Sequence, residues 1–148
     1  MSLYQHILLA IDLSEGSQHI ALKAQQLATS YQAKLSIIHV AALVPVMNLA
    51  YEDPALFDDN LNQLFMSTAE TSLANFIESH ALTPQQRFLE QGDPREEIMR
   101  VAAENQVDLI VLGSHGRHGL ALLLGSTANS VLHHAKCDVL AVRLPESL

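Results

Sequence analysis

Three glycines and two hydroxyl residues near the C-terminus could together hold phosphate groups. Gly113 directly follows an apolar stretch, Val-Asp-Leu-Ile-Val-Leu, that predicts a buried strand. Gly125 precedes Ser126 and Thr127, which open a predicted helix. Glycine lets the backbone approach a ligand closely because it lacks a Cβ atom, and a helix start presents unpaired N–H groups and the positive end of the helix dipole. The segment therefore predicts a phosphate-binding site.

The spacing of these glycines differs from that of two common phosphate-binding motifs. Two residues separate Gly113 from Gly116, and eight residues separate Gly116 from Gly125. A P-loop would end in Gly-Lys-Ser/Thr, which is missing, and Gly119 stands at the wrong distance for a dinucleotide fingerprint. The alternative is a strand-to-helix connection without a ligand, in which the two hydroxyl residues only cap their helix.

Predicted strands alternate with predicted helices along the whole chain. Strands are predicted at 4–11, 34–40, 87–90, 107–112 and 138–143, and helices at about 20–31, 61–80, 94–105 and 126–134. Asp12 or Ser14 is the predicted cap of the first helix, and Asp93 with Pro94 marks the start of the third. The alternation predicts an α/β fold, an open parallel sheet with helices on both faces.

In a sheet of this kind, ligands bind outside the carboxyl ends of the strands. Three segments should meet there: the turn at Asp12, the end of the second strand at Val40, and the glycine segment. Residues 41–57 contain Pro45 and Pro54 and are predicted to form a loop that can move or cover a site.

Composition narrows the class of protein and of partner. The 148 residues fit a single domain spanning 1–148, and 49% of them are hydrophobic, enough for a substantial core. A net charge of -8 with scattered basic residues argues against nucleic acid as a partner. The single cysteine, Cys137, fits a cytoplasmic location, and no apolar run is long enough to span a membrane.

Taken together, several stretches resemble the universal stress protein family. They are residues 4–14, 33–40, 92–94, 108–116 and 124–142. The resemblance implies a five-stranded parallel sheet of order 3-2-1-4-5 and a homodimer in which the last strands meet. Many members bind ATP through Gly-x2-Gly-x9-Gly-Ser/Thr, and others lack these glycines. This chain keeps the three glycines and the serine, but its second spacer has eight residues instead of nine.

Carried over by position, the resemblance assigns roles to individual residues. The glycines with Ser126 and Thr127 would surround the phosphates, and His115 and Arg117 could reach them. Asp12 would lie beside the ribose or the adenine, and Val40 would meet adenine through its backbone. The full set of candidate nucleotide-binding residues is Ala10, Ile11, Asp12, Val40, Gly113, Ser114, His115, Gly116, Arg117, Gly125, Ser126 and Thr127.

Metal and catalytic chemistry have little support in the sequence. Four histidines fall between His115 and His134, but no cysteine or carboxylate joins them at ligand spacing, so no transition-metal site is expected. No nucleophile motif is present. If ATP binds, slow hydrolysis assisted by Mg²⁺ is the most turnover that we expect.

The sequence therefore predicts a cytoplasmic homodimer that binds ATP or a related adenine nucleotide, alone or with Mg²⁺, and acts in the stress response through a change of conformation. Two alternatives stay open. One is a dimer of the same family that binds no nucleotide and acts through an unknown protein partner. The other is an ATP-dependent enzyme on the same scaffold.

Overall fold

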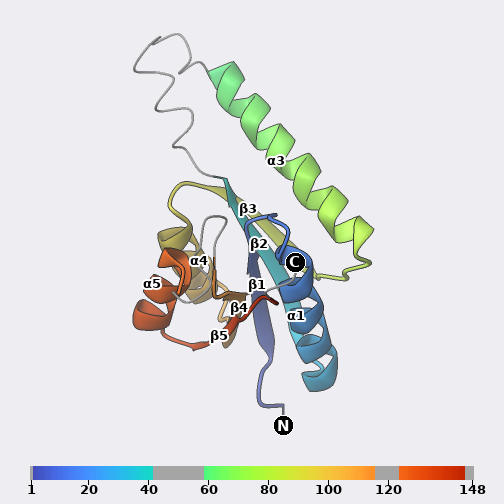
Figure 1. Cartoon of the computed structure of the whole chain (residues 1–148), viewed down its shortest axis with the longest axis vertical. Coiled ribbons are helices and arrows are strands. Elements are labelled where there is room, and N and C mark those ends of the chain that lie inside the picture. Colours follow the sequence, from blue (N-terminus) through green and yellow to red (C-terminus); the bar gives the residue numbers. More distant parts are fainter. Residues whose placement is uncertain (1, 42–58, 116–123, 146–148) are drawn as a thin grey trace.

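The computed structural model describes residues 2–41, 59–115 and 124–145, in which strands and helices alternate (Figure 1). The strands are β1 (His6–Ile11), β2 (Lys34–Ala41), β3 (Gln86–Gln91), β4 (Leu109–Gly113) and β5 (Asp138–Val142). The helices are α1 (Ser17–Tyr31), α3 (Asp59–Ser79), α4 (Pro94–Glu104) and α5 (Ser126–His134). No helix in this part of the chain has the length and apolar character needed to cross a lipid bilayer.

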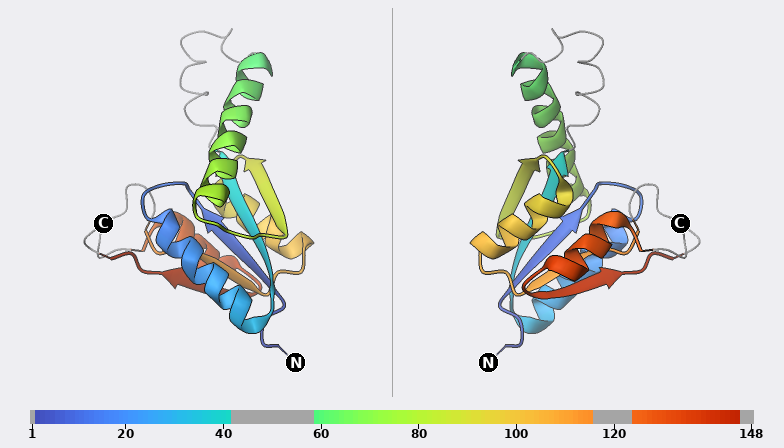
Figure 2. Two further views of the ribbon diagram at one scale, coloured as in Figure 1. Left: turned by 90° about the vertical axis from the view of Figure 1, so that its right-hand side faces the viewer. Right: turned by 90° about the vertical axis from the view of Figure 1, so that its left-hand side faces the viewer.

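The five strands form one parallel sheet of order β3-β2-β1-β4-β5, which confirms the predicted fold and strand order. The chain builds the sheet outward from β1 to β3, then returns to the other side of β1 and adds β4 and β5. The strand order therefore reverses between β1 and β4. Figure 2 shows the twisted sheet between two layers of helices.

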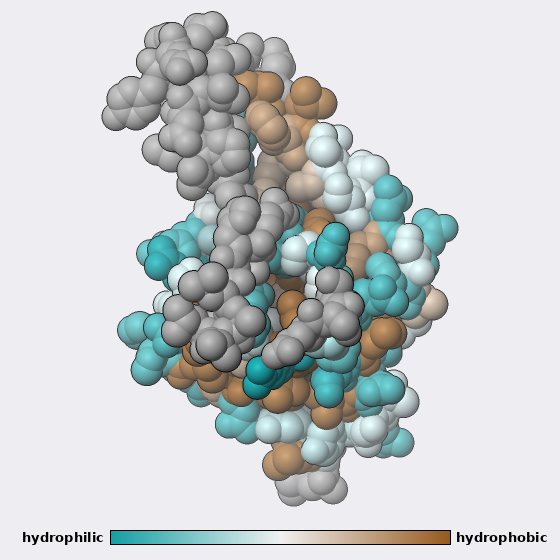
Figure 3. Space-filling view, viewed as in Figure 1, coloured by the Kyte–Doolittle hydropathy of each residue, from teal (hydrophilic) through white to brown (hydrophobic). Residues whose placement is uncertain are grey.

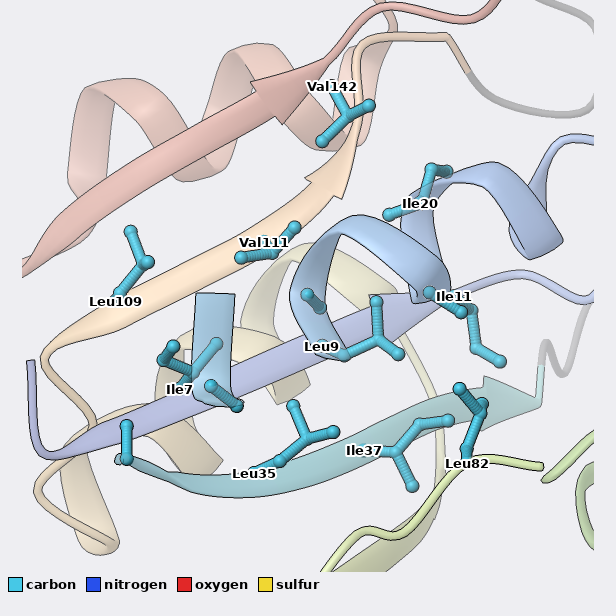
Figure 4. Packing of buried hydrophobic residues seen from close by; sticks show 14 of the residues in the cluster. Ile7, Leu9, Ile11, Ile20, Leu35, Ile37, Leu82, Leu109, Val111 and Val142 are labelled. Atoms are coloured by element: carbon cyan, nitrogen blue, oxygen red, sulfur yellow. The ribbon is translucent and has the colours of Figure 1, made fainter. Parts of the chain in front are cut away.

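Successive side chains of β1 enter two separate cores. Ile7 and Leu9 pack with residues of α1 on one face (Figure 4), whereas Leu8 and Ala10 pack with α4 and α5 on the other. All six residues of the strand are buried. Each large aliphatic side chain contributes roughly 1.5–3 kcal/mol on burial, so β1 must keep its register for both cores to form.

The start of α1 differs from the prediction. The residue before the helix is Gly16, and no side chain caps the first turn. Asp12 Oδ1 instead accepts hydrogen bonds from the Ser14 N–H at 3.0 Å, the Ser14 hydroxyl at 2.5 Å and the Ser17 hydroxyl at 3.2 Å. The expected cap by Asp12 or Ser14 was therefore wrong, because these groups bond to one another and fold the turn. For α4 the predicted cap is confirmed: Asp93 accepts from Arg95 N–H at 2.9 Å.

β1 and β4 begin later than predicted. At the start of β1, the side chain of Asp108 accepts the hydrogen bonds that a neighbouring strand would otherwise accept. Asp108 accepts hydrogen bonds from the N–H groups of Gln5, at 2.8 Å, and His6, at 3.0 Å. The ladder of β1 therefore begins at His6, and that of β4 begins at Leu109. The predicted bounds of α5 are confirmed, while the predicted loop at 42–57 lies outside the described residues.

Large apolar side chains are exposed on the first turns of α3. The space-filling view shows apolar atoms over the upper part of this helix (Figure 3). There Leu64 is 62% exposed and Phe65 is 40% exposed. Leu73, further along, is buried against the sheet. The helix is thus anchored by its C-terminal half.

His6 is a buried imidazole that joins β1 to two other elements. Its Nδ1 lies 2.9 Å from the Asn105 carbonyl oxygen, so this nitrogen donates its proton, and its Nε2 lies 2.7 Å from the Ser36 hydroxyl. Burial is the main cause of the lowered pKa of His6. The folded protein therefore holds this ring in its neutral form.

We predict that the protein loses stability as the pH falls from 7 to 5. Below about pH 6.5 the unfolded chain binds a proton at His6 before the folded chain does, which favours unfolding. Urea unfolding of the wild type and of His6→Asn at both pH values measures the effect. The pH dependence should shrink in His6→Asn and persist in His19→Asn, which removes an imidazole from α1. An equal pH dependence in all three proteins would contradict this role.

Candidate functional site

A cavity of about 130 Å³ lies at the carboxyl edge of the sheet, where the strand order reverses between β1 and β4. The ends of β1, β2 and β4 form its floor, and the first turns of α4 and α5 form its wall. Nine of the twelve residues proposed from the sequence line this cavity. They are Ala10, Ile11, Asp12, Val40, Gly113, His115, Gly125, Ser126 and Thr127.

The other three candidates have different positions. Ser114 is only 9% exposed and is not part of the cavity wall. Gly116 and Arg117 lie outside the described residues. The structure therefore brings most of the predicted set together in one place, from four elements that are far apart in the sequence.

Some wall residues were missed by the sequence analysis. Pro94 and Ile98 from α4 contribute to the wall, although the start of this helix was recognised from its Asp-Pro signal. That signal follows β3, whose carboxyl end lies at the same edge of the sheet, so the strand-end rule could have included α4. The remaining wall residues are Ile20, Ile38, Leu112 and Ala128.

The cavity has an apolar side and a polar side. β2 and α4 supply apolar groups, with Ile38, Val40 and Ile98 among them. α5 and the residues that follow β4 supply polar groups, including His115 and the Ser126 hydroxyl. β2 and β4 flank β1 on opposite sides, and Leu112 of β4 and Ala128 of α5 add apolar groups beside the polar ones. A ligand with a flat apolar part and a polar or anionic part fits this division.

The N-terminus of α5 opens directly onto the polar side. Gly125 is the residue before the helix, and no side chain makes a cap hydrogen bond. The alternative in which Ser126 and Thr127 act only as caps is therefore wrong, since both stand inside the helix and line the cavity. The first N–H groups of an α-helix have no acceptor within the helix and carry its positive dipole end. This end of α5 suits an anionic group.

Ser114 ties the polar side to the edge of the sheet. Its N–H donates to the Val142 carbonyl of β5 at 2.9 Å, and its own carbonyl accepts from the Gly125 N–H at 2.6 Å. Its hydroxyl lies 2.9 Å from Nδ1 of His115, the side chain that lines the cavity. Ser114 is thus a positioning residue, which fixes both α5 and the imidazole relative to β4.

Two carboxylates lie near the cavity and are held by local hydrogen bonds. Asp12 lines the wall and is bonded through Oδ1 to the turn after β1. Asp93 stands one residue before Pro94, and its hydrogen bonds with the side chain of Arg95 lower its pKa. Among the described residues, Asp12 is therefore the carboxylate that a polar group or cation bound in the cavity would contact first.

Comparison with known proteins gives one consistent family. The model of the universal stress protein family matches residues 3–143. Universal stress protein A homolog 1 of Coxiella burnetii is 39% identical over 145 residues, covering 97% of this chain and 99% of the relative. The match thus extends over essentially the full length of both chains.

Solved structures of the same family share the fold. UspA from Lactobacillus plantarum has a TM-score of 0.69 at 25% identity, over 95% of this chain and 98% of that one. A universal stress protein solved in complex with cAMP has a TM-score of 0.63 at 24% identity, over 97% of this chain and 98% of that one.

Gly113, the first glycine of the predicted phosphate-binding segment, is also closely packed. A Cβ atom at this position would lie 2.7 Å from Cδ1 of Ile20, which belongs to α1 and also lines the cavity. Real Cβ atoms are not found this close to another heavy atom. The absence of a side chain lets α1 approach the end of β4, whatever ligand the cavity takes.

We predict that Gly113→Ala costs about 1–3 kcal/mol of unfolding free energy through overpacking. Ile20→Val removes the Cδ1 atom in question and alone should cost about 0.5–1.5 kcal/mol. The double variant should be more stable than the sum of the two single changes allows, because the clash is relieved. Denaturant unfolding of all four proteins measures this coupling. Strict additivity would show that Ile20 is not what excludes a Cβ at Gly113.

Proposed function

Because the chain belongs to the universal stress protein family, we propose that it binds an adenine nucleotide in the cavity at the carboxyl edge of the sheet. One observation carries the proposal. The apolar wall from β2 and α4 faces the N-terminus of α5 across a single cavity. Such a site can hold a flat base at one side and an anionic phosphate at the other.

The apolar side supports a purine base in particular. Ala10, Ile38 and Ile98 offer buried aliphatic surface, on which a ring can be desolvated without loss of hydrogen bonds. Val40 lies beside them at the end of β2, where backbone N–H and C=O groups can form hydrogen bonds with the edge of the base. The family member solved with cAMP shares the fold and supports an adenine nucleotide as the ligand class.

The polar side supports phosphate. Ser126 and Thr127 add hydroxyl groups to the first turn of α5, and His115 adds an imidazole held by Ser114. The chain carries a net charge of -8, so the affinity for an anion must come from these local groups. With ATP, Mg²⁺ would be held mainly by the phosphates, and Asp12 is the carboxylate of the wall that could meet its water shell.

We further propose that the nucleotide acts by biasing the conformation of the last strand. The Ser114 hydrogen bonds connect the start of α5 to Val142 of β5. A ligand that bridges α5 and the end of β4 would stiffen this connection. The signal then reaches the edge of the sheet without chemical turnover, which fits a regulatory role in the stress response of the cytoplasm.

The same strand is the proposed interface of a homodimer. β5 forms one edge of the sheet and can accept a second chain. Leu140 on this strand is 37% exposed, and Leu132 on the neighbouring α5 is 43% exposed. Apolar side chains on an unpaired edge are costly in water, so pairing with a second copy would bury them.

We predict that Ser126→Asp weakens adenine nucleotide binding about tenfold or more, because a carboxylate at the start of α5 repels phosphate. The same carboxylate suits the positive dipole end and should leave the fold as stable or about 0.3–1 kcal/mol more stable. Calorimetric titration with ATP and with cAMP measures the affinities, and denaturant unfolding measures the stability.

Ser126→Asn is the matched control, since it is nearly isosteric with Asp but uncharged, and it should keep most of the affinity. Equal binding by the Asp and Asn variants would place the phosphate elsewhere. If the wild type binds neither nucleotide at millimolar concentration, the proposal fails. The alternative function is that of a dimer that binds no nucleotide and acts through a protein partner. The eight-residue glycine spacer favours this alternative.

We predict that Leu140→Glu converts the homodimer to a monomer at micromolar concentration. A surface change of this kind should alter the stability of the monomer fold by only about 0.5 kcal/mol. Leu64→Glu on α3, at a leucine that is more exposed than Leu140, should leave the dimer intact. Sedimentation velocity measures the oligomeric state. Dissociation by the change at Leu64, and not by that at Leu140, would move the interface to α3.

A further inference from the structure

A second cavity lies at the opposite edge of the sheet from the proposed nucleotide site. Its volume is about 180 Å³, it is partly open to solvent, and it is lined by the end of α4, the start of β4 and the connection from α5 to β5. Ala102, Val107 and Ile110 are buried residues of its wall, and the half-buried Met99 and Cys137 also line it. The buried part of its wall is therefore apolar, and the polar lining residues, Gln106 among them, are exposed.

The walls are fixed by backbone hydrogen bonds and cannot collapse easily. The Val107 N–H donates to the Ala102 carbonyl at 3.0 Å, which closes the end of α4. The Asn105 side chain donates to the Val101 carbonyl at 2.8 Å, and the Ala135 N–H donates to the Val131 carbonyl at 2.9 Å. A cavity with such supports is preformed, as small-molecule sites usually are.

The chemistry of the walls favours an apolar occupant over water. Across the described residues, no buried side-chain nitrogen or oxygen atom lacks a hydrogen-bond partner. No buried polar side chain therefore needs a hydrogen bond from a ligand or a water in this cavity. An ordered water needs two to four polar partners, which the buried side chains of this wall do not offer. The volume of about 180 Å³ suits a molecule the size of one aromatic ring.

The surroundings of the buried part of the cavity disfavour an anionic ligand. Both α4 and α5 end here, so their negative dipole ends point toward it. Burial, followed by the nearby carboxylates of Asp138 and Asp108, raises the pKa of the Cys137 thiol, which shows that this region disfavours negative charge. Lys136 and His134 line the cavity too, but both are exposed and stand at its rim.

We propose that this cavity is a second ligand site, which takes a small uncharged apolar molecule the size of one aromatic ring or a short aliphatic chain. It uses the C-terminal ends of α4 and α5, whereas the first cavity uses their N-terminal ends. The two sites therefore share no wall residue, and this proposal does not depend on nucleotide binding.

Toluene and benzoate are the probes that test the site and its charge preference. In the full-length protein labelled at methionine methyl groups, toluene should shift the Met99 resonance in a saturable way and leave that of Met66 on α3 unchanged. Saturating toluene should also slow the alkylation of Cys137 by iodoacetamide severalfold. Benzoate should bind about tenfold more weakly or worse, because its carboxylate would enter a negative region.

Ala102→Leu is the variant that fills the cavity, and it should abolish both effects. Ala74→Leu, an equal enlargement on the opposite face of the sheet, should preserve them. If Ala102→Leu fails to fold, the wild-type titration and the alkylation rate still decide the question. An unmoved Met99 resonance together with an unchanged alkylation rate up to the solubility limit of toluene would overturn the proposal. So would equal affinity for benzoate, or full binding by a folded Ala102→Leu protein.

Discussion

The burial of β1 on both faces and along both edges is the constraint on which the rest of the structure depends. Its side chains enter the core under α1 and the core under α4 and α5 alternately, and its backbone pairs with β2 and β4. A shift of β1 by one residue would exchange the two cores. Because the chain leaves β1 first on one side and later returns on the other, the strand order must reverse beside it, and the reversal opens the first cavity at that point.

Side-chain carboxylates complete this arrangement where backbone pairing ends. At the amino end of β1, Asp108 takes the N–H groups of Gln5 and His6, and the buried His6 ring joins Ser36 to Asn105. At the carboxyl end, Asp12 folds the turn that leads into α1. The central strand is therefore held at both ends by acidic groups, and its carboxyl end is placed firmly against the cavity.

The sequence allowed the fold to be predicted because its signals are local and repeated. Apolar runs and helix starts along the chain placed all five strands and the helices of the described residues within a few positions. What could not be predicted depends on contacts between distant segments. The entry of Ile98 into the cavity wall requires the assembled sheet. The bond between Asp12 and Ser14 is different, because it is local and competes with the alternative of capping α1. The second cavity depends on how α4 and α5 pack together, and the periodicity of apolar residues in the sequence does not predict this packing.

The eight-residue glycine spacer lies between Ser114 and Gly125, which are held in place by hydrogen bonds. Ser114 and Gly125 are joined by a hydrogen bond of 2.6 Å, and Ser114 is also bonded to β5. The position of α5 relative to β4 is therefore set by these bonds and by the packing of Ala128 and Val131 in the core, whatever the number of residues between. A family motif with nine residues and this chain with eight can thus present the same helix N-terminus to the cavity. The dipole end of α5, its hydroxyl groups and the apolar wall therefore line the cavity with a spacer of eight residues.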